Sequence, residues 1–275
     1  MDVKIIEMNE RKCKFILKNS SPARANALRR TILFDIPKMA IDNVEFWLGH
    51  ADWGNETNTP LFNEIVAHRL GMIPIPTDEN FEVDNLSPDK DYRSSAIKYV
   101  IKENGPKIVY SGDLKLVDGP VNVEDKSLLE IRDKGIPIVE LGKGQSILAY
   151  AYAVMGTAKK HIKWQVASGV GYKYMPVINI DDGEIDFVQD IAKSCPKNVF
   201  DVKNGKLVVR DALVCSLCRT CEELSGGSVT VVGDSSQFLF TFETDGSLTA
   251  QQVINKAVSI LSKNAKKVAD DVAAL

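Results

Sequence analysis

Four cysteines in the second half of the chain are the residues whose types and spacing could carry chemistry. Cys215, Cys218 and Cys221, called here the cysteine triplet, follow a C-x2-C-x2-C pattern. Nineteen residues separate the triplet from Cys195, which directly precedes a proline. Three close thiolates and one remote thiolate are the ligand pattern of many iron–sulfur clusters. The spacing therefore predicts a cluster bound by these four residues.

Zinc and a disulfide are the alternatives for these thiols. Structural zinc sites also use four cysteines, but they usually present them as two C-x2-C arms rather than as a consecutive triplet. A disulfide between two members of the triplet is the third interpretation, although a reducing cytoplasm disfavours it. The segment 198–214, between the ligands, predicts a hairpin around "KNGK", as in ferredoxins. An iron–sulfur cluster is therefore favoured over zinc.

The remaining candidates for chemistry do not form a second site. Cys13 lies on the apolar face of an alternating strand pattern, so we expect it to be a small core residue. The sequence contains no P-loop and no dinucleotide-binding glycine motif. The histidines have no metal spacing and no nucleophile partner: His50, His68 and His161. The densest acidic group is interpreted as a solvated loop: Asp181, Asp182, Glu184 and Asp186.

Length and charge limit what the chain can do. It has 275 residues, so two or three domains are expected. The formal net charge is −3, which gives no overall basic field to attract nucleic acid. The basic group Lys159, Lys160 and Lys163 beside Trp164 is therefore expected to contact protein. The N-terminus lacks a signal peptide, and the apolar run 147–156 is too short to span a bilayer. We expect a cytoplasmic protein that does not enter a membrane.

Both ends of the chain predict strands and a helix. The N-terminal segment predicts two strands, a helix over 22–36 that Ser21 caps, and a third strand over 39–47. The C-terminal segment predicts a hairpin over 228–246, turning at "GDSS", and a helix over 248–275. Neither end has enough strands to be stable alone. We therefore predict that the two ends share one sheet with two helices on one face.

The C-terminal helix carries more apolar surface than one small sheet needs. Its apolar residues step by four and three, which is the spacing of a helix–helix contact. We call these residues the apolar seam: Ile254, Val258, Leu261, Ala265, Val268, Val272 and Leu275. The helix over 22–36 has alanines on one stripe, and these would let another helix approach closely. A partner helix is therefore expected.

The predicted fold class is α+β, with three parts. Residues 1–46 and 226–275 form a discontinuous dimerisation domain, built as a sheet with two helices. Residues 47–170 form an inserted, mostly-β domain that contains a short helix and an exposed loop over 78–95. Residues 171–225 form a ferredoxin-like, cluster-binding domain.

Three stretches resemble the D subunits of archaeal DNA-directed RNA polymerase. This family is related to the N-terminal domain of the bacterial alpha subunit and to the third-largest eukaryotic polymerase subunits. The stretches are "NALRRTILFDIPKMAIDNVEF" at 26–46, "LFNEIVAHRLGMIPI" at 61–75 and "GKGQSILAYAYAVMGTAKKHIKW" at 142–164. Their order and spacing, with the split terminal halves, extend the resemblance over nearly the whole chain.

The resemblance implies an assembly platform with no catalytic residues of its own. In this family the discontinuous domain pairs with the small L subunit. The small zinc-binding N and P subunits join the pair, and the heterodimer seeds assembly of the large catalytic subunits. DNA is reached only through the assembled enzyme. The implied partner interface is Ala27, Leu28, Arg29, Arg30, Ile254, Val258, Leu261 and Val268. Arg29 and Arg30 match paired arginines that face the large subunits.

The resemblance also implies one iron–sulfur cluster on Cys195, Cys215, Cys218 and Cys221, because some members of the family carry such a domain. It allows a [4Fe-4S] or a [3Fe-4S] form, and zinc stays the alternative metal. A different class of function is a ferredoxin-type electron carrier or redox-enzyme subunit, which reversible electron transfer to a metabolic partner would support. A further hypothesis is that a labile cluster tunes polymerase assembly to oxygen or iron supply.

Overall fold

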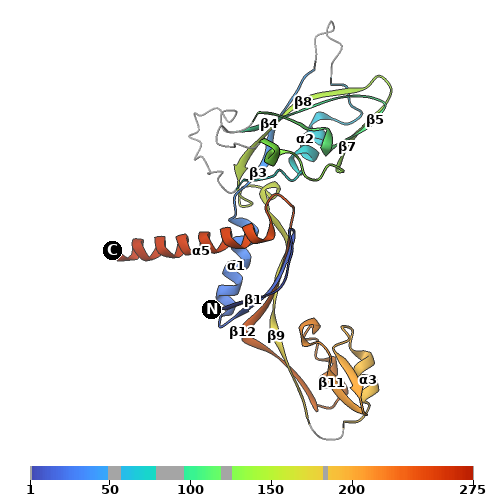
Figure 1. Ribbon diagram of the computed structural model, residues 1–275, viewed down its shortest axis with the longest axis vertical. Coiled ribbons are helices and arrows are strands. Elements are labelled where there is room, and N and C mark those ends of the chain that lie inside the picture. Colours follow the sequence, from blue (N-terminus) through green and yellow to red (C-terminus); the bar gives the residue numbers. More distant parts are fainter. Residues whose placement is uncertain (1, 49–56, 79–95, 119–125, 182–184, 275) are drawn as a thin grey trace. The chain divides into compact units, whose positions relative to one another are not determined.

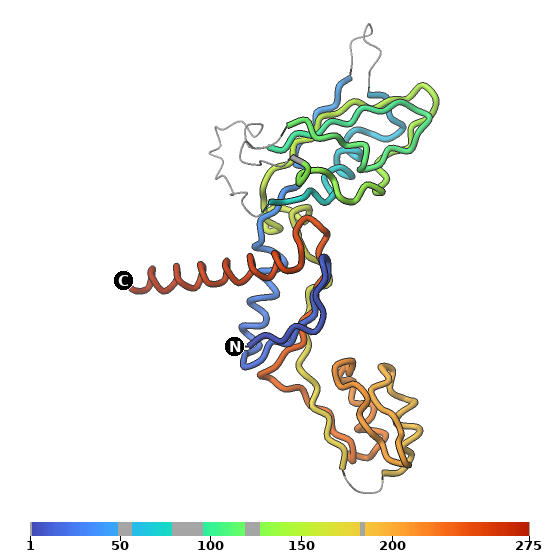
Figure 2. The backbone as a smooth tube through the Cα atoms, in the orientation of Figure 1, coloured from blue at the N-terminus to red at the C-terminus, as the bar shows by residue number. Residues whose placement is uncertain are grey.

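The structure is a computed structural model, and it describes residues 2–48, 57–78, 96–118, 126–181 and 185–274 (Figure 2). The chain divides into two compact units. Unit one comprises residues 1–7, 13–27 and 171–241, and unit two comprises residues 8–12, 28–170 and 242–275. All the cysteines belong to unit one, whereas the C-terminal helix and most of the predicted insert belong to unit two.

A four-stranded sheet joins the two ends of the chain (Figure 1). Its strand order is β1-β2-β12-β9, with β1 (Asp2–Met8), β2 (Lys12–Lys18), β9 (Ala167–Ile180) and β12 (Val229–Thr244). The C-terminal strand β12 therefore lies between the N-terminal strand β2 and the middle strand β9. This order confirms the prediction that strands from both ends of the chain share one sheet.

Aromatic side chains form the core on this sheet. The rings of Phe15 and Phe240 stack with their centroids 5.2 Å apart, and the ring of Tyr172 stacks on Phe240 at 5.4 Å. Phe238 and Phe240 are both buried, as the alternating pattern predicted. Cys13 is also buried, which confirms it as a core residue, and this burial raises the pKa of its thiol to about 11.

The predicted hairpin over 228–246 is wrong. β12 is one continuous strand of 16 residues that passes through the "GDSS" sequence. A tight hairpin needs positive φ at its turn, and none of residues 233–236 adopts one. Instead, the Asp234 carboxylate accepts hydrogen bonds from the Ser236 backbone N–H and from the Gln237 amide, both at 2.8 Å. These polar residues therefore bond to one another along an extended strand.

Unit two contains a second four-stranded sheet, in the order β3-β8-β4-β6. Its strands are β3 (Lys38–Phe46), β4 (Ile97–Asn104), β6 (Lys115–Asp118) and β8 (Ser146–Gly156). The strand predicted over 39–47 is present, but it pairs with β8 rather than with a terminal strand. Met39 and Ile41 bury their side chains in the core of this second sheet, so β3 belongs to it.

The predicted short helix and short strands of the insert are present. The helix α2 (Asn63–Gly71) buries Val66 and Leu70 in the core of the second sheet. A two-stranded sheet pairs β5 (Lys107–Tyr110) with β7 (Pro137–Leu141). Short 3-10 helices include η2 (Ser111–Asp113), η3 (Lys126–Leu129), η4 (Ile162–Trp164) and η5 (Ala212–Val214). Nearly all of the loop predicted over 78–95 lies outside the described residues.

The helices predicted near the two ends of the chain are confirmed. α1 (Pro22–Phe34) begins after Ser21, whose hydroxyl accepts a hydrogen bond from the Arg24 N–H at 3.4 Å. α5 (Ala250–Ala273) begins after Thr249, which forms a reciprocal capping box with Gln252. α5 has 24 residues and is about 36 Å long. No helix among the described residues combines the length and apolarity that crossing a bilayer requires.

The cysteine-bearing segment folds into α3 (Val188–Ser194), β10 (Phe200–Lys203), β11 (Lys206–Val209) and α4 (Thr220–Leu224). β10 and β11 pair as a hairpin with Lys203 opposite Lys206. Asn204 and Gly205 at its turn have φ values of 53° and 76°. A two-residue type I′ turn requires positive φ at both of its central residues. The predicted "KNGK" hairpin is confirmed.

Trp164 packs against a glycine in unit two. Its side chain is buried, and its indole N–H donates a hydrogen bond to the Val154 carbonyl at 3.0 Å. A Cβ atom added at Gly156 would lie 2.4 Å from the indole ring. Only a hydrogen atom therefore fits between this position of β8 and the ring.

We expect Gly156→Ala to destabilise unit two by about 1–3 kcal/mol, because the added methyl group must displace the Trp164 ring or the strand. Urea unfolding followed by tryptophan fluorescence measures the effect. Gly135→Ala is the matched control, since a Cβ atom at Gly135 meets nothing within 4 Å. Equal unfolding midpoints for the two variants would contradict the close contact.

Candidate metal centre and helical surface

Cys195 lies directly after α3, where the chain turns toward β10. The Asn198 N–H closes this turn by donating to the Cys195 carbonyl at 3.0 Å, and Asn198 has a φ of 50°. The next amide, the Val199 N–H, donates to the Cys195 sulfur at 3.4 Å. The turn therefore presents one partly buried thiol with a backbone donor beside it.

The β10–β11 hairpin returns the chain to this turn. The Val199 carbonyl accepts hydrogen bonds from the N–H groups of Arg210 at 2.8 Å and Asp211 at 3.3 Å. The Asp211 carboxylate then accepts from the Leu213 N–H at 2.8 Å and caps η5, which ends directly before Cys215. The hairpin thus brings the two distant parts of the predicted ligand set into one small folded region.

The cysteine triplet lies in the segment 213–221, called here the triplet loop, which begins in η5 and ends in the first turn of α4. Cys215 and Cys221 are buried, whereas Cys218 is exposed. Leu217 and Arg219 have φ values of 58° and 63°. Residues other than glycine rarely adopt this conformation, and those that do occur in turns and cluster at functional sites. The Leu217 N–H also donates to the Cys215 sulfur at 3.4 Å.

The thiols of the triplet have different electrostatic environments. Hydrogen bonds from the backbone and the hydroxyl of Thr220 lower the pKa of the Cys218 thiol. Burial raises the pKa of the Cys221 thiol, and the neighbouring Cys215 and Cys218 raise it further. The three thiols are therefore close enough to influence one another, and a bound cation would relieve the repulsion between their thiolates.

The donor chemistry fits a four-thiolate metal group, but the ligands are not closed around a common point. Cys195, Cys215 and Cys221 belong to one apolar cluster, and hydrogen bonds to sulfur are a usual feature of iron–sulfur sites. Within the described residues, no three His, Cys, Asp or Glu side chains gather at the spacing of a metal site. All five cysteines are described and all are free thiols, so no disulfide joins members of the triplet.

A lysine that the sequence did not single out contacts the triplet loop. Lys173 on β9 donates through Nζ to the Leu213 carbonyl at 2.6 Å and to the Cys215 carbonyl at 2.5 Å. Burial lowers the pKa of this lysine. Lys173 and Cys215 are 42 positions apart in the chain. No local sequence pattern could therefore have marked the two residues as neighbours.

The predicted partner residues of α1 differ in exposure. Leu28 is 4% exposed, so its side chain packs almost completely within the chain. Arg30 is exposed, and Ala27 and Arg29 are partly buried. Of the predicted interface residues on α1, Arg30 is therefore the most accessible and Leu28 the least.

α5 is covered only over its first two turns. Its buried residues are Ala250, Val253 and Ala257, and every residue from 262 to 274 is exposed. Within the apolar seam, Ile254 and Leu261 are partly buried. The exposed fractions of the other large seam side chains are 51% for Val258, 62% for Val268 and 63% for Val272. The last seam residue, Leu275, lies outside the described residues. The second half of α5 therefore carries an uncovered apolar stripe.

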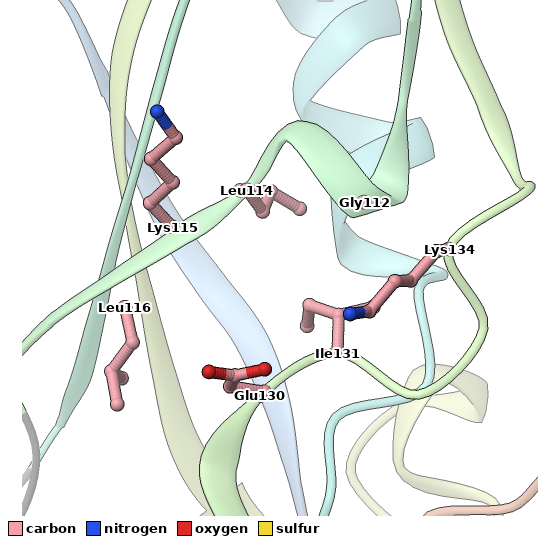
Figure 3. Close-up of a pocket in the computed structure, with 7 residues that line it drawn as sticks. All are labelled: Gly112, Leu114, Lys115, Leu116, Glu130, Ile131 and Lys134. Carbon is pink, nitrogen blue, oxygen red and sulfur yellow. The ribbon is translucent and has the colours of Figure 1, made fainter. Parts of the chain in front are cut away.

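One pocket in unit two, of about 270 Å³, lies away from the cysteines (Figure 3). It is lined by Gly112, Leu114, Lys115, Leu116, Glu130, Ile131 and Lys134. Its charged side chains are two lysines and one glutamate, all from exposed residues. Among the described residues that line it there is no serine, cysteine or histidine.

A second pocket brings His68 and His161 together, beside Asp42 and Lys163, in a volume of about 380 Å³. Both histidines are exposed. The Lys163 ammonium pairs with Asp42 at 2.5 Å, and Lys159 pairs with Asp35 at the same distance. The basic group is therefore engaged by carboxylates of unit two. Besides Leu275, three of the residues considered above lie outside the described part of the chain: His50, Asp182 and Glu184.

Comparison with known proteins gives one consistent result. Residues 14–265 match the family model of the RNA polymerase Rpb3/Rpb11 dimerisation domain. The Rpo3 subunit of the DNA-directed RNA polymerase of Thermoplasma volcanium is 39% identical over 267 residues, which cover 95% of either chain. Rpo3 of Picrophilus torridus is 40% identical and covers 94% of this chain and 95% of its own. Rpo3 of Pyrococcus furiosus is 34% identical, and the match covers 97% of this chain and 95% of its own.

We expect iodoacetamide at pH 8 to label Cys218 and to leave Cys13 unmodified in the native, reduced, metal-free chain. The thiolate is the reacting form. Cys218 is exposed, whereas Cys13 is buried with a pKa of about 11, so only about one Cys13 thiol in a thousand is ionised at pH 8.

Mass spectrometry of the peptides after brief labelling measures this difference. The urea-unfolded chain is the control, because there both cysteines should react. Labelling of native Cys13 should rise only as the pH approaches 11. Equal labelling of Cys13 in the native and unfolded chains at pH 8 would contradict its burial.

Proposed function

Because the chain belongs to the Rpb3/Rpb11 family, as an archaeal Rpo3 (D-type) component of DNA-directed RNA polymerase, we propose that it nucleates the enzyme by pairing with the small L subunit. As an Rpo3 subunit it is part of a nucleotidyltransferase complex and has no catalytic site of its own. The platform role is supported by the uncovered half of α5. No polymerase chemistry is assigned to the pockets of unit two.

The apolar seam is the observation that carries the pairing. Val258, Val268 and Val272 stay more than half exposed although they lie on one stripe of a regular helix. Covering a valine side chain stabilises a complex by about 1–2 kcal/mol. A helix of the L subunit with the same spacing would cover all three residues and Leu261 in one contact. Ala27 on α1 is a second proposed contact residue, because its small, partly buried side chain leaves room for a partner to approach that helix closely.

The other proposed partners follow from the same assignment. The small N and P subunits and the large catalytic subunits would join the heterodimer, with Arg29 and Arg30 facing the large subunits. DNA would be reached only through the assembled enzyme, in the cytoplasm. A ferredoxin-type electron carrier has no support in the family match, which spans residues 14–265.

We also propose that Cys195, Cys215, Cys218 and Cys221 hold one iron–sulfur cluster, in a [4Fe-4S] or [3Fe-4S] form, with zinc as the alternative. The grouping of three of these thiols in one apolar cluster and the backbone donors to two sulfurs support this site. Bound there, the group would cross-link the turn after α3 to the triplet loop through metal–thiolate bonds, four of them for a [4Fe-4S] cluster or zinc. The chain's own part is to hold the thiols together and to keep water away from the two buried ones.

We expect Val258→Glu to weaken binding to a co-expressed L subunit at least about tenfold, because the contact would bury an unpaired carboxylate. Co-purification followed by titration of the separated subunits measures the loss. Ser259→Glu is the matched control, since Ser259 is exposed on the next position of α5 but lies off the seam. Equal binding by the two variants would reject the seam as the contact.

After strictly anaerobic purification, we expect about four or three irons per chain, with acid-labile sulfide in matching amount. Cys218→Ser should lose most of this iron, because a serine oxygen is a poor ligand for the cluster. Cys13→Ala, which changes a cysteine remote from the triplet in the sequence, should retain it. One zinc per chain without sulfide would reject the cluster and support the zinc site. A wild-type chain with no bound metal would reject both the cluster and the zinc site.

A further inference from the structure

Lys173 joins the sheet β1-β2-β12-β9 to the triplet loop through two hydrogen bonds. It lies on β9, and its partners Leu213 and Cys215 lie in the loop, all within unit one. The two hydrogen bonds measure 2.6 Å and 2.5 Å, and the lysine is partly buried. Hydrogen bonds from a charged donor are shorter and stronger than neutral ones. One ammonium group therefore holds two carbonyls on the N-terminal side of the triplet.

These contacts leave little freedom for Cys215. Its carbonyl accepts from Lys173, and its N–H donates to the Ala212 carbonyl at 3.1 Å. Its sulfur accepts from the Leu217 N–H at 3.4 Å. Both backbone polar groups and the thiol of Cys215 are thus engaged before any metal binds. A ligand held in this way loses little conformational freedom when it binds.

The C-terminal side of the triplet is fixed separately, on β12. The Glu222 carboxylate accepts a hydrogen bond from the Val231 N–H, and the Ser225 hydroxyl accepts one from the Val229 N–H at 2.9 Å. Apolar packing joins the loop to the same sheet. The Leu217 side chain lies 3.5 Å from the point where a Cβ atom would stand at Gly233 of β12. The loop is therefore tied to β12 at its end, and Lys173 supplies the tie to β9 at its start.

We propose that Lys173 is a positioning residue for the metal site: by holding the Leu213 and Cys215 carbonyls on β9, it fixes Cys215 in place as a ligand. This inference rests on the proposed metal site. Without the ammonium, the two carbonyls would have to find water or other donors, and the loop start would move independently of the sheet. The carbonyl contacts do not depend on metal, so the positioning exists in the metal-free chain.

Two variants and one control test this role. Lys173→Met keeps most of the side-chain length but removes the ammonium, and Lys173→Arg restores a charged donor. Lys206→Met is the matched control, because Lys206 is an exposed lysine of β11 in the same unit. All are compared in the full-length chain, in the presence and absence of metal.

Hydrogen exchange of the reduced, metal-free chain measures the anchoring directly. We expect the amides of residues 213–217 to exchange about tenfold faster in Lys173→Met than in the wild type, since the lost hydrogen bonds lower the cost of local opening. Amides of the β10–β11 hairpin should keep their rates, which also shows that the variant is folded. Lys173→Arg should recover most of the protection. Unchanged exchange in Lys173→Met would overturn the proposal.

Metal retention measures the consequence for the site. After loading under anaerobic conditions, the metal should leave Lys173→Met several-fold faster than the wild type when a chelator is added. Lys173→Arg should be close to the wild type, and Lys206→Met equal to it. Equal loss rates for wild type and Lys173→Met would reject the positioning role alone. A wild-type chain that takes up neither iron nor zinc would reject the metal site itself, and the positioning role with it.

Discussion

The pairing of β12 between β2 and β9 is the constraint on which the rest of the chain depends. This sheet cannot be completed until a strand near the C-terminus meets strands from the N-terminus and the middle of the chain. Such long-range pairing is slow to form, because the long intervening chain loses conformational entropy before any stabilising strand contact is made. The same strand follows the cysteine-bearing segment in sequence and precedes α5. Its placement in the sheet therefore fixes where the cysteine-bearing segment ends in unit one.

The two functional elements rely on different physical effects. α5 presents apolar side chains that the chain itself leaves uncovered, so the proposed partner contact would be driven by removing them from water. The cysteine region buries few large side chains, among them Ile191, Phe200 and Leu207. A region with so small a core commonly needs a metal or disulfide cross-link to hold it. All its cysteines are free, which leaves metal binding as the proposed cross-link.

The sequence predicted elements well where the signal was local. The "KNGK" turn, the Ser21 cap of α1 and the burial of Cys13 each depend on a residue and its immediate neighbours. The hairpin at "GDSS" failed because turn-forming residues are also tolerated in a long strand, where Asp234 bonds to Ser236 and Gln237. β3 has the expected strand pattern, yet its alternation of apolar residues does not specify which sheet it joins.

The sequence by itself determined the spacing of the thiols, the stepping of the apolar seam and the resemblance to the polymerase family. These properties follow from the order of the residues alone and do not depend on contacts between distant parts of the chain. Only the tertiary structure decided that β12 is continuous, that β3 pairs with β8, and that Lys173 holds the loop before Cys215. Strand partners and buried polar contacts depend on which distant surfaces exclude water together, and a local pattern carries no information about that choice.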